Sequence, residues 1–215
     1  MKKYDIIVWD FNGTVLDDVR LGIDCVNTML AKRNLPTLPD ETAYRRVFGF
    51  PIEEYYQRLG FDFAKEDYHT VLAPEWVEMY LENYRSSPLT EHAVQTLQTL
   101  GEMGYVQILL SATELQMLKN QLKGLGLEQY FEEVCGLDNI HAGSKLDAAV
   151  AWRAQHPDAV ALFVGDTVHD FDVASAVGAD CVLYSQGHQS REQLSSCGCR
   201  MIDDLSELID LLSAQ

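Results

Sequence analysis

The fold is decided by the stretch Trp9-Asp10-Phe11-Asn12-Gly13-Thr14. It follows an apolar run, residues 4–8, that predicts a buried parallel strand, because strands covered on both faces are apolar almost throughout. A carboxylate, Asp10, therefore stands where this strand ends, and a Gly-Thr turn comes soon after it. Open α/β sheets bind their ligands at the carboxyl ends of their strands. The stretch thus predicts an α/β fold with a ligand site at Asp10.

Residues 86–215 alternate between apolar runs and amphipathic segments. The expected strands are Val106–Leu110, Val134–Gly136, Ala159–Val164 and Cys181–Tyr184. The expected helices are Thr90–Met103, Glu114–Leu125, residues 143–155, Asp170–Val177 and Leu205–Leu212. Alternation of this kind predicts a parallel sheet with right-handed crossovers. The expected fold class is a Rossmann-like, doubly wound α/β core.

Residues 18–85 have a different pattern, with apolar residues at helical spacing and no convincing strand. Asp17 or Asp18 can cap the first of these helices. The expected domains are an α/β core of residues 1–17 and 86–215, and an all-helical cap of residues 18–85 inserted just after the first strand. A cap at the mouth of the site could exclude water and select the substrate.

The composition excludes several classes of partner. The formal net charge is −17 and the isoelectric point is about 4.5, which argues against nucleic acid or an anionic membrane as a partner. The longest apolar runs are far shorter than the roughly 20 residues of a membrane span. The five cysteines, an odd number without a secretory signal, indicate reduced thiols and a cytoplasmic location. A small molecule is the expected partner, and the oligomeric state is left open.

Carboxylates at two strand ends predict a metal site and a nucleophile. Asp10 and Asp166 each follow an expected strand, and Asp170 comes one helical turn after Asp166. A carboxylate can attack phosphorus to form an aspartyl-phosphate, which water then hydrolyses. Mg²⁺ neutralises phosphate oxygens and prefers carboxylate and carbonyl ligands. Asp10, Asp166 and the backbone carbonyl of Asn12 are therefore candidate ligands, and Asp170 either binds the metal or orients its waters.

A second set of residues is suited to phosphate. Ser111 follows an expected strand, so its hydroxyl and the N–H groups after it, beginning at Ala112, can bind phosphate oxygens. Lys145 offers a compact positive charge to the same oxygens and to the nucleophile. Each of these signals alone is weak. Together they favour one phosphate site, because all of them are expected, in this order along the chain, at the edge where α/β sheets bind ligands.

The four segments together resemble the motifs of the haloacid dehalogenase superfamily, over essentially the whole chain. Three are intact: residues 108–113, Gly143-Ser144-Lys145, and the run from Gly165-Asp166 to Asp170. The helical insertion resembles the C1-type cap, and Phe48-Gly49-Phe50-Pro51 resembles the cap loop of phosphoglycolate-phosphatase-like members. The resemblance implies a Mg²⁺-dependent phosphatase in which Asp10 is the nucleophile and Ser111 and Lys145 bind phosphate. Phe48 and Phe50 are candidate substrate contacts because they flank Gly49.

Asn12 departs from this resemblance, because the family's usual form is Asp-x-Asp-Gly-Thr. An acid at this position protonates the leaving group, which an amide cannot do, and general acid–base catalysis contributes about 10²–10⁴ in rate. The leading hypothesis is a Mg²⁺-dependent hydrolase of small phosphorylated metabolites, slowed at Asn12. The alternative is a catalytically impaired protein of the same fold that binds a phosphorylated ligand or has a regulatory role. Replacing Asn12 by Asp is expected to restore the proton donor.

Three further features stay open. His169 is interpreted as a surface residue at a helix start, with a contact to substrate as the alternative, and the loop residue His188 has no assigned role. Aromatic side chains in the cap are interpreted as cap core, apart from Phe48 and Phe50. The other aromatics are Tyr44, Tyr55, Tyr56, Trp76 and Tyr80.

Overall fold

The computed structural model describes residues 3–141 and 144–213, and these residues contain one six-stranded sheet. Its strands are β1 (Ile6–Trp9), β2 (Val106–Glu114), β3 (Glu133–Leu137), β4 (Ala161–Gly165), β5 (Asp180–Tyr184) and β6 (Arg200–Ile202). The spatial order is β3-β2-β1-β4-β5-β6, and every neighbouring pair is parallel. This is the doubly wound order of Rossmann-like sheets, in which the winding reverses beside β1. The expected fold class is confirmed.

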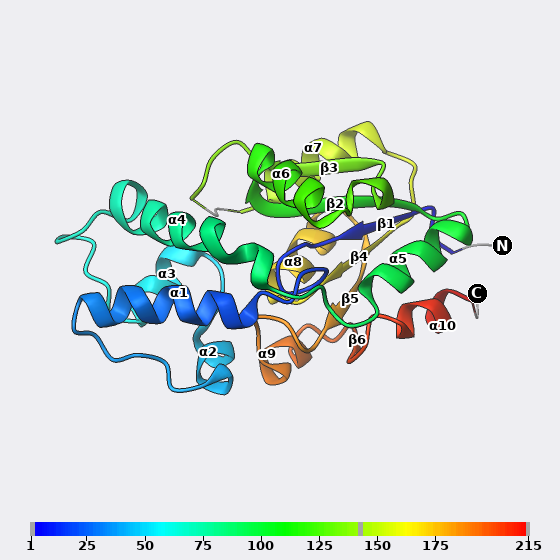
Figure 1. Cartoon of the computed structure of the whole chain (residues 1–215). Helices are drawn as coiled ribbons and strands as arrows, with labels where there is room; N and C mark the ends of the chain where they lie inside the picture. The colour runs from blue at the N-terminus through cyan, green and yellow to red at the C-terminus, as the bar shows by residue number, and fades with distance from the viewer. Residues whose placement is uncertain (1–2, 142–143, 214–215) are drawn as a thin grey trace.

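Helices cover both faces of the sheet (Figure 1). Alternate residues of β1 face opposite sides: Ile7 and Trp9 pack in one apolar cluster, and Ile6 and Val8 pack in another. The first cluster includes side chains of α5 (Ala93–Glu102), α6 (Leu115–Leu125) and α10 (Glu207–Ser213). The second includes side chains of α7 (Leu146–Gln155) and α8 (Val168–Ala176). Because β1 is buried on both faces, the position of Asp10 at its end is fixed by the core.

The inserted segment is helical and lies beyond one end of the sheet, opposite the chain termini (Figure 1). Its helices are α1 (Val19–Lys32), α2 (Glu41–Val47), α3 (Ile52–Arg58), the π-helical turn η1 (Tyr68–Leu72), α4 (Ala73–Asn83) and the 3₁₀ turn η2 (Tyr84–Ser86). These helices bury an apolar cluster of their own, to which all but η2 contribute. The all-helical cap is therefore observed, whereas its proposed limits, residues 18–85, stay a prediction.

Some elements differ from the sequence-based expectation. The strand β6 and the helix α9 (Arg191–Ser195) were not expected, and neither was the 3₁₀ turn η3 (Glu128–Tyr130). The strand β2 runs to Glu114, beyond the expected end at Leu110, so the phosphate-binding candidates lie in an irregular extension of the strand. Asp18 stands at the start of α1, but its side chain makes no capping hydrogen bond there. It is used elsewhere, as described below.

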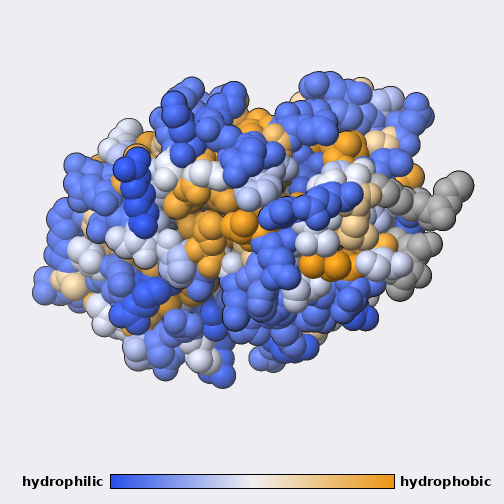
Figure 2. Space-filling model, turned by 45° about the vertical axis from the view of Figure 1, so that its right-hand side comes forward, coloured by the Kyte–Doolittle hydropathy of each residue, from blue (hydrophilic) through white to orange (hydrophobic). Residues whose placement is uncertain are grey.

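The surface is mostly hydrophilic, as the net charge of −17 requires, but hydrophobic side chains gather across the middle of one face (Figure 2). Within residues 3–141 and 144–213, no helix has both the length and the apolar character to cross a bilayer. All five cysteines are free.

Candidate active site

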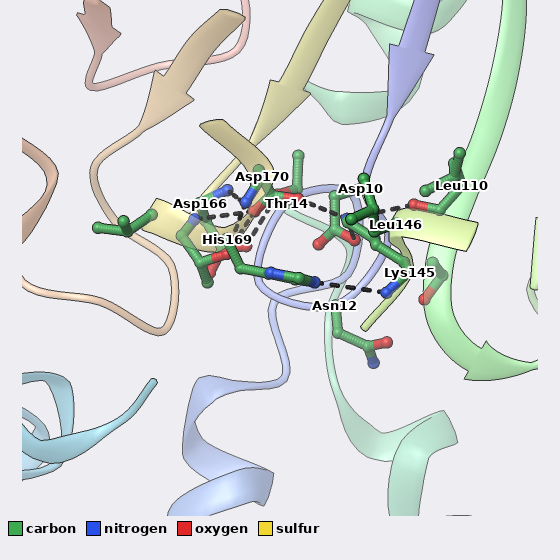
Figure 3. A network of polar contacts seen from close by, with 12 residues as sticks. Asp10, Asn12, Thr14, Leu110, Lys145, Leu146, Asp166, His169 and Asp170 are labelled. Carbon is green, nitrogen blue, oxygen red and sulfur yellow. Dashed lines mark hydrogen bonds and ion pairs between the residues drawn. The ribbon is translucent and has the colours of Figure 1, made fainter. Parts of the chain in front are cut away.

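Three carboxylates lie together at the carboxyl edge of the sheet (Figure 3). Asp10 follows β1, Asp166 follows the neighbouring strand β4, and Asp170 lies in the first turn of α8. One oxygen from each of the three lies within 4.8 Å of the other two. Oxygens of this kind and spacing suit a hard divalent cation such as Mg²⁺. The donor set therefore fits the metal that the sequence predicts.

The start of α8 holds this cluster in place. Thr167 caps the helix, and its backbone N–H and hydroxyl both donate to Oδ2 of Asp170, at 2.9 and 2.6 Å. The backbone N–H of Asp166 donates to the same oxygen at 3.2 Å. A capping box thus occupies one oxygen of Asp170 and leaves the other, Oδ1, facing Lys145.

The ammonium group of Lys145 lies among these carboxylates (Figure 3). Its Nζ is 2.6 Å from Oδ1 of Asp10, pairs also with Oδ1 of Asp170, and donates to the carbonyl of Leu110 at 3.3 Å. The side chain is buried, so its charge is neutralised by partners rather than by water. Gly143, which precedes it in the motif, lies outside the described residues.

Crowding raises the pKa values of two of the three carboxyl groups. Burial raises the pKa of Asp10 well above its usual range; Lys145 offsets part of this, and Asp170 and Asp166 add to it. Burial likewise raises the pKa of Asp166 to about 6. For Asp170 burial acts in the same direction, but the Lys145 ammonium outweighs it and lowers the pKa. The single ammonium of Lys145 therefore does not balance the three carboxyl groups, and a divalent cation would neutralise the remaining negative charge.

The phosphate-binding candidates form a chain of hydroxyl contacts at the end of β2. Ser111 Oγ donates to Thr113 Oγ1 at 3.1 Å, and Thr113 Oγ1 donates to Oδ1 of Asn12 at 3.0 Å. Ser111, Ala112 and Thr113 all line the cavity that contains Asp10. The structure thus brings the β1 and β2 segments together, as expected from their positions at adjacent strand ends.

The amide of Asn12 has partners on both sides. Its nitrogen donates to Oδ2 of Asp18 and to the hydroxyl of Tyr80, both at 2.7 Å. Tyr80 also donates to Asp18 at 2.7 Å. With its oxygen held by Thr113, the amide is fixed in one orientation, and its two N–H groups face the start of α1 and the cap helix α4. Neither Asp18 nor Tyr80 was expected in the site.

His188, in the loop after β5, completes the network around Asp18. Its Nε2 is 3.1 Å from Oδ1 of Asp18, its Nδ1 is 2.8 Å from the hydroxyl of Tyr44, and its backbone N–H donates to Asp166 at 2.6 Å. Burial would lower the pKa of His188, but the charge and hydrogen bond of Asp18, together with the charges of Asp166 and Asp10, raise the pKa to about 9. His188 and Asp18 therefore form a buried ion pair at neutral pH.

Gly13 is required by this arrangement. Its φ is +74°, and a Cβ built on it would lie 2.3 Å from Oδ2 of Asp166 and 2.5 Å from Cδ2 of His188. Any side chain here would strain the backbone and displace both residues.

The sequence had only one signal for His188, which was its position after an expected strand of the sheet.

The interpretation of His169 as a surface residue is wrong, because its ring is partly buried, lines the cavity and stacks on Phe50, with centroids 4.5 Å apart. Its Nε2 accepts a 3.4 Å hydrogen bond from the backbone N–H of Lys145. Burial and the Lys145 charge lower the pKa of His169, so the ring is neutral at pH 7.

Residues 7–184 match the family model of haloacid dehalogenase-like hydrolases. The chain belongs to this family. This hydrolase is 27% identical to a phosphoglycolate phosphatase of Nitrosococcus oceani, over 99% of this chain and 98% of the relative. It is 25% identical to one of Haemophilus influenzae strain 86-028NP, over 98% and 99%. A solved structure described as a predicted phosphoglycolate phosphatase, from Haemophilus somnus 129PT, has the same fold, with a TM-score of 0.79 at 20% identity over 98% and 99% of the two chains.

In this haloacid dehalogenase-like hydrolase, the cap covers the carboxylate cluster and leaves a cavity of about 150 Å³. We call its polar side, which includes Asp10, Lys145 and Asp166, the floor, and its cap side the roof. Phe48 and Phe50 line the roof, and their contact with substrate stays a prediction. The other aromatic residues named from the sequence also line the roof, and each belongs as well to an apolar cluster that contains cap side chains. They are Tyr44, Tyr55, Tyr56, Trp76 and Tyr80.

Proposed function

We propose that this hydrolase is a Mg²⁺-dependent phosphatase of small phosphorylated metabolites in the cytoplasm, and that it acts through an aspartyl-phosphate on Asp10. One observation carries the proposal: Asp10 lies in a buried cluster with two further carboxylates and the ammonium of Lys145. A nucleophile, a metal-binding donor set and a phosphate-binding cation are then in one place. The phosphoglycolate phosphatases among the relatives support the same reaction class.

In the first half-reaction, a carboxylate oxygen of Asp10 attacks phosphorus while the bond to the leaving-group oxygen breaks. Asp10, Asp166, Asp170 and the backbone carbonyl of Asn12 would hold Mg²⁺, which when bound neutralises charge on phosphoryl oxygens. Lys145 balances the charge of the nucleophile and of the transferred group. The Ser111 hydroxyl and the N–H of Ala112 orient the phosphoryl oxygens.

In the second half-reaction, water attacks phosphorus, and phosphate and the free Asp10 carboxylate are regenerated. Asn12 cannot donate a proton in the first step or accept one in the second, because it carries an amide. Both its N–H groups are also held, by Asp18 and Tyr80. We therefore propose that turnover is slow wherever proton transfer limits the rate.

The test is release of inorganic phosphate with Mg²⁺ and with EDTA, for the wild type and two variants. Asp10→Asn removes the nucleophile and a ligand, so we expect no release. Asp17→Asn makes the same chemical change at an exposed neighbour and should keep wild-type activity. Release by the wild type should stop in EDTA. Release by Asp10→Asn at the wild-type rate, or release by the wild type that EDTA leaves unchanged, would disprove the mechanism.

The second candidate, a phospho-ligand binding protein, is favoured by the fully engaged amide of Asn12. It predicts Mg²⁺-dependent binding of phosphate without turnover. Calorimetry with inorganic phosphate, together with mass spectrometry for a phosphorylated Asp10, separates the two candidates. Binding without phosphorylated Asp10 or released phosphate supports the second.

A further inference from the structure

The cavity has no uncommitted cation for a second anionic group of a substrate, as far as the described residues show. Lys145 is the only Lys or Arg among the described lining residues, and it is paired with Asp10 and Asp170. The charge of His188 is compensated by Asp18. A carboxylate on the leaving group would therefore enter a buried, mostly acidic site without a partner, which is costly.

Three arginines of the cap pair away from the cavity, and no arginine or lysine of residues 18–85 is among its lining residues. Arg33, at the C-terminal end of α1, pairs with Glu66 and Glu75, and Arg45 donates to two carbonyls of the loop after β5. Arg58 donates to a carbonyl at the end of α2. None of the three lines the cavity. The cap therefore selects by shape and apolar contact rather than by charge.

The roof is built of aromatic rings that contact each other at their edges and faces. Phe48 meets Phe50 edge-on, with centroids 6.0 Å apart and planes at 83°. Trp76 stacks on Tyr80 at 4.7 Å and 15°. Rings in such pairs offer further faces and edges to an aromatic ligand. The whole cavity, floor included, has a volume of about 150 Å³, so beside a phosphoryl group it has room for a small leaving group only.

Asn12 supplies an independent constraint, on the leaving group's chemistry. Without a proton from the residue at this position, the leaving group must depart as an anion. A phenol has a pKa of about 10, whereas an alcohol is close to water, about 16. A phenolate oxygen therefore leaves far more readily than an alkoxide. The same compound, an aryl phosphate, satisfies both the apolar roof and the missing acid.

We propose that the substrate's leaving group is a single uncharged aromatic ring, joined to the phosphoryl group through its oxygen. This inference rests on the proposed function and names its substrate class. The Asp10–phosphorus bond forms as the phosphorus–aryl oxygen bond breaks, and the electron pair stays on the phenolate, which takes its proton from solvent. Water then attacks phosphorus and releases phosphate.

The test compares three substrates under Mg²⁺: phenyl phosphate, benzyl phosphate, whose ring is bound but whose leaving group is an alcohol, and 2-phosphoglycolate. We expect kcat/KM for phenyl phosphate to exceed that for 2-phosphoglycolate about 100-fold. Benzyl phosphate should keep a similar KM but lose about 100-fold in kcat. Faster turnover of 2-phosphoglycolate or equal kcat for benzyl phosphate overturns the inference alone. No Mg²⁺-dependent release from any of the three overturns the proposed function as well.

Variants test the roof directly. Phe50→Leu should raise the KM for phenyl phosphate roughly threefold to tenfold. Phe63→Leu is the matched control, because Phe63 packs in the cap but does not line the cavity, and its KM should stay within about twofold of wild type. Val77→Arg places a cation in the roof and should shift the KM ratio at least about tenfold toward 2-phosphoglycolate. Equal effects of Phe50→Leu and Phe63→Leu, or no shift with Val77→Arg, contradict the assignment.

Discussion

The floor and the roof of the cavity differ in how completely their polar groups are paired. On the floor, the ammonium of Lys145 pairs with the carboxylates of Asp10 and Asp170, and Asn12 has a partner for its oxygen and for both N–H groups. On the roof, rings pack on rings, and the Tyr55 hydroxyl has no partner among the described residues. A floor whose polar groups are hydrogen-bonded to one another is rigid and fixes the chemistry, whereas an apolar roof tolerates substitution and can set which leaving group fits.

Removing the charge of Lys145 should have the largest effect. Lys145→Gln leaves the carboxylates of Asp10 and Asp170 buried together without their cation, so we expect about 3–5 kcal/mol less stability in urea unfolding without metal. Lys65→Gln is the matched control, since Lys65 makes only an exposed pair with Asp62, and it should cost less than about 1 kcal/mol. Similar losses in the two variants would show that the floor is not electrostatically coupled.

The ion pair of His188 and Asp18 should make stability depend on pH. The pKa of His188 rises from 6.5 to about 9 on folding, so its contribution is complete below about pH 6.5 and disappears as the pH rises through 9. A shift of this size corresponds to about 3 kcal/mol. Urea unfolding at pH 6.5 and 9.5 measures the loss, which should be absent in His188→Gln. An equally steep decline in that variant would refute the assignment.

Exchanging the amide and the carboxylate of Asn12 and Asp18 should change the reaction. Asn12→Asp alone sets two carboxylates in contact, because Oδ2 of Asp18 lies 2.7 Å from Nδ2 of Asn12. The expected gain therefore needs the double variant Asn12→Asp/Asp18→Asn, which keeps one negative charge and one amide. We expect about 10²-fold faster hydrolysis of benzyl phosphate in the double variant and little change for phenyl phosphate. A gain in the single variant equal to that in the double would mean that Asp18 does not matter.

The smallest effect is expected from one hydroxyl on the roof. Tyr55→Phe removes a buried hydroxyl without a partner, so the free energy of unfolding should rise by about 1 kcal/mol. Tyr80→Phe removes a hydroxyl that is bonded to Asn12 and Asp18, and it should lower this free energy by about 1–3 kcal/mol. Thermal melts of both variants test whether losing the unpaired hydroxyl stabilises the protein while losing the paired hydroxyl destabilises it.

The sequence predicts the parts of the site that lie at strand ends, because a strand places the residue after it directly. Asp10 and Asp166 follow the central strands β1 and β4, and Lys145 stands one residue before α7. The structure brings these residues together with Asp170. Their catalytic and metal-binding roles stay predictions that the variants above would test.

The sequence could not reveal the network behind the floor. Asp18, Tyr80 and His188 are far apart in the chain, and only the closed cap brings them together. Asp18 also directly precedes a helix, a position where Asp commonly caps the first turn, so the local sequence predicted capping rather than a contact with Asn12 or His188. The strand β6, Arg200–Ile202, is only three residues long, too short for a pattern of alternation to be recognised.

Three tyrosine hydroxyls bond the cap to the core, and this has a consequence for how the cap opens. Tyr44 bonds to His188, Tyr80 accepts from Nδ2 of Asn12 at 2.7 Å, and Tyr68 donates to the carbonyl of His141 at 2.8 Å. Each hydroxyl gives up water when the cap closes and regains it when the cap opens, so each contact contributes only about 0.5–1.5 kcal/mol. We expect the loss of one phenolic oxygen to shift the ratio of open to closed cap roughly twofold to tenfold.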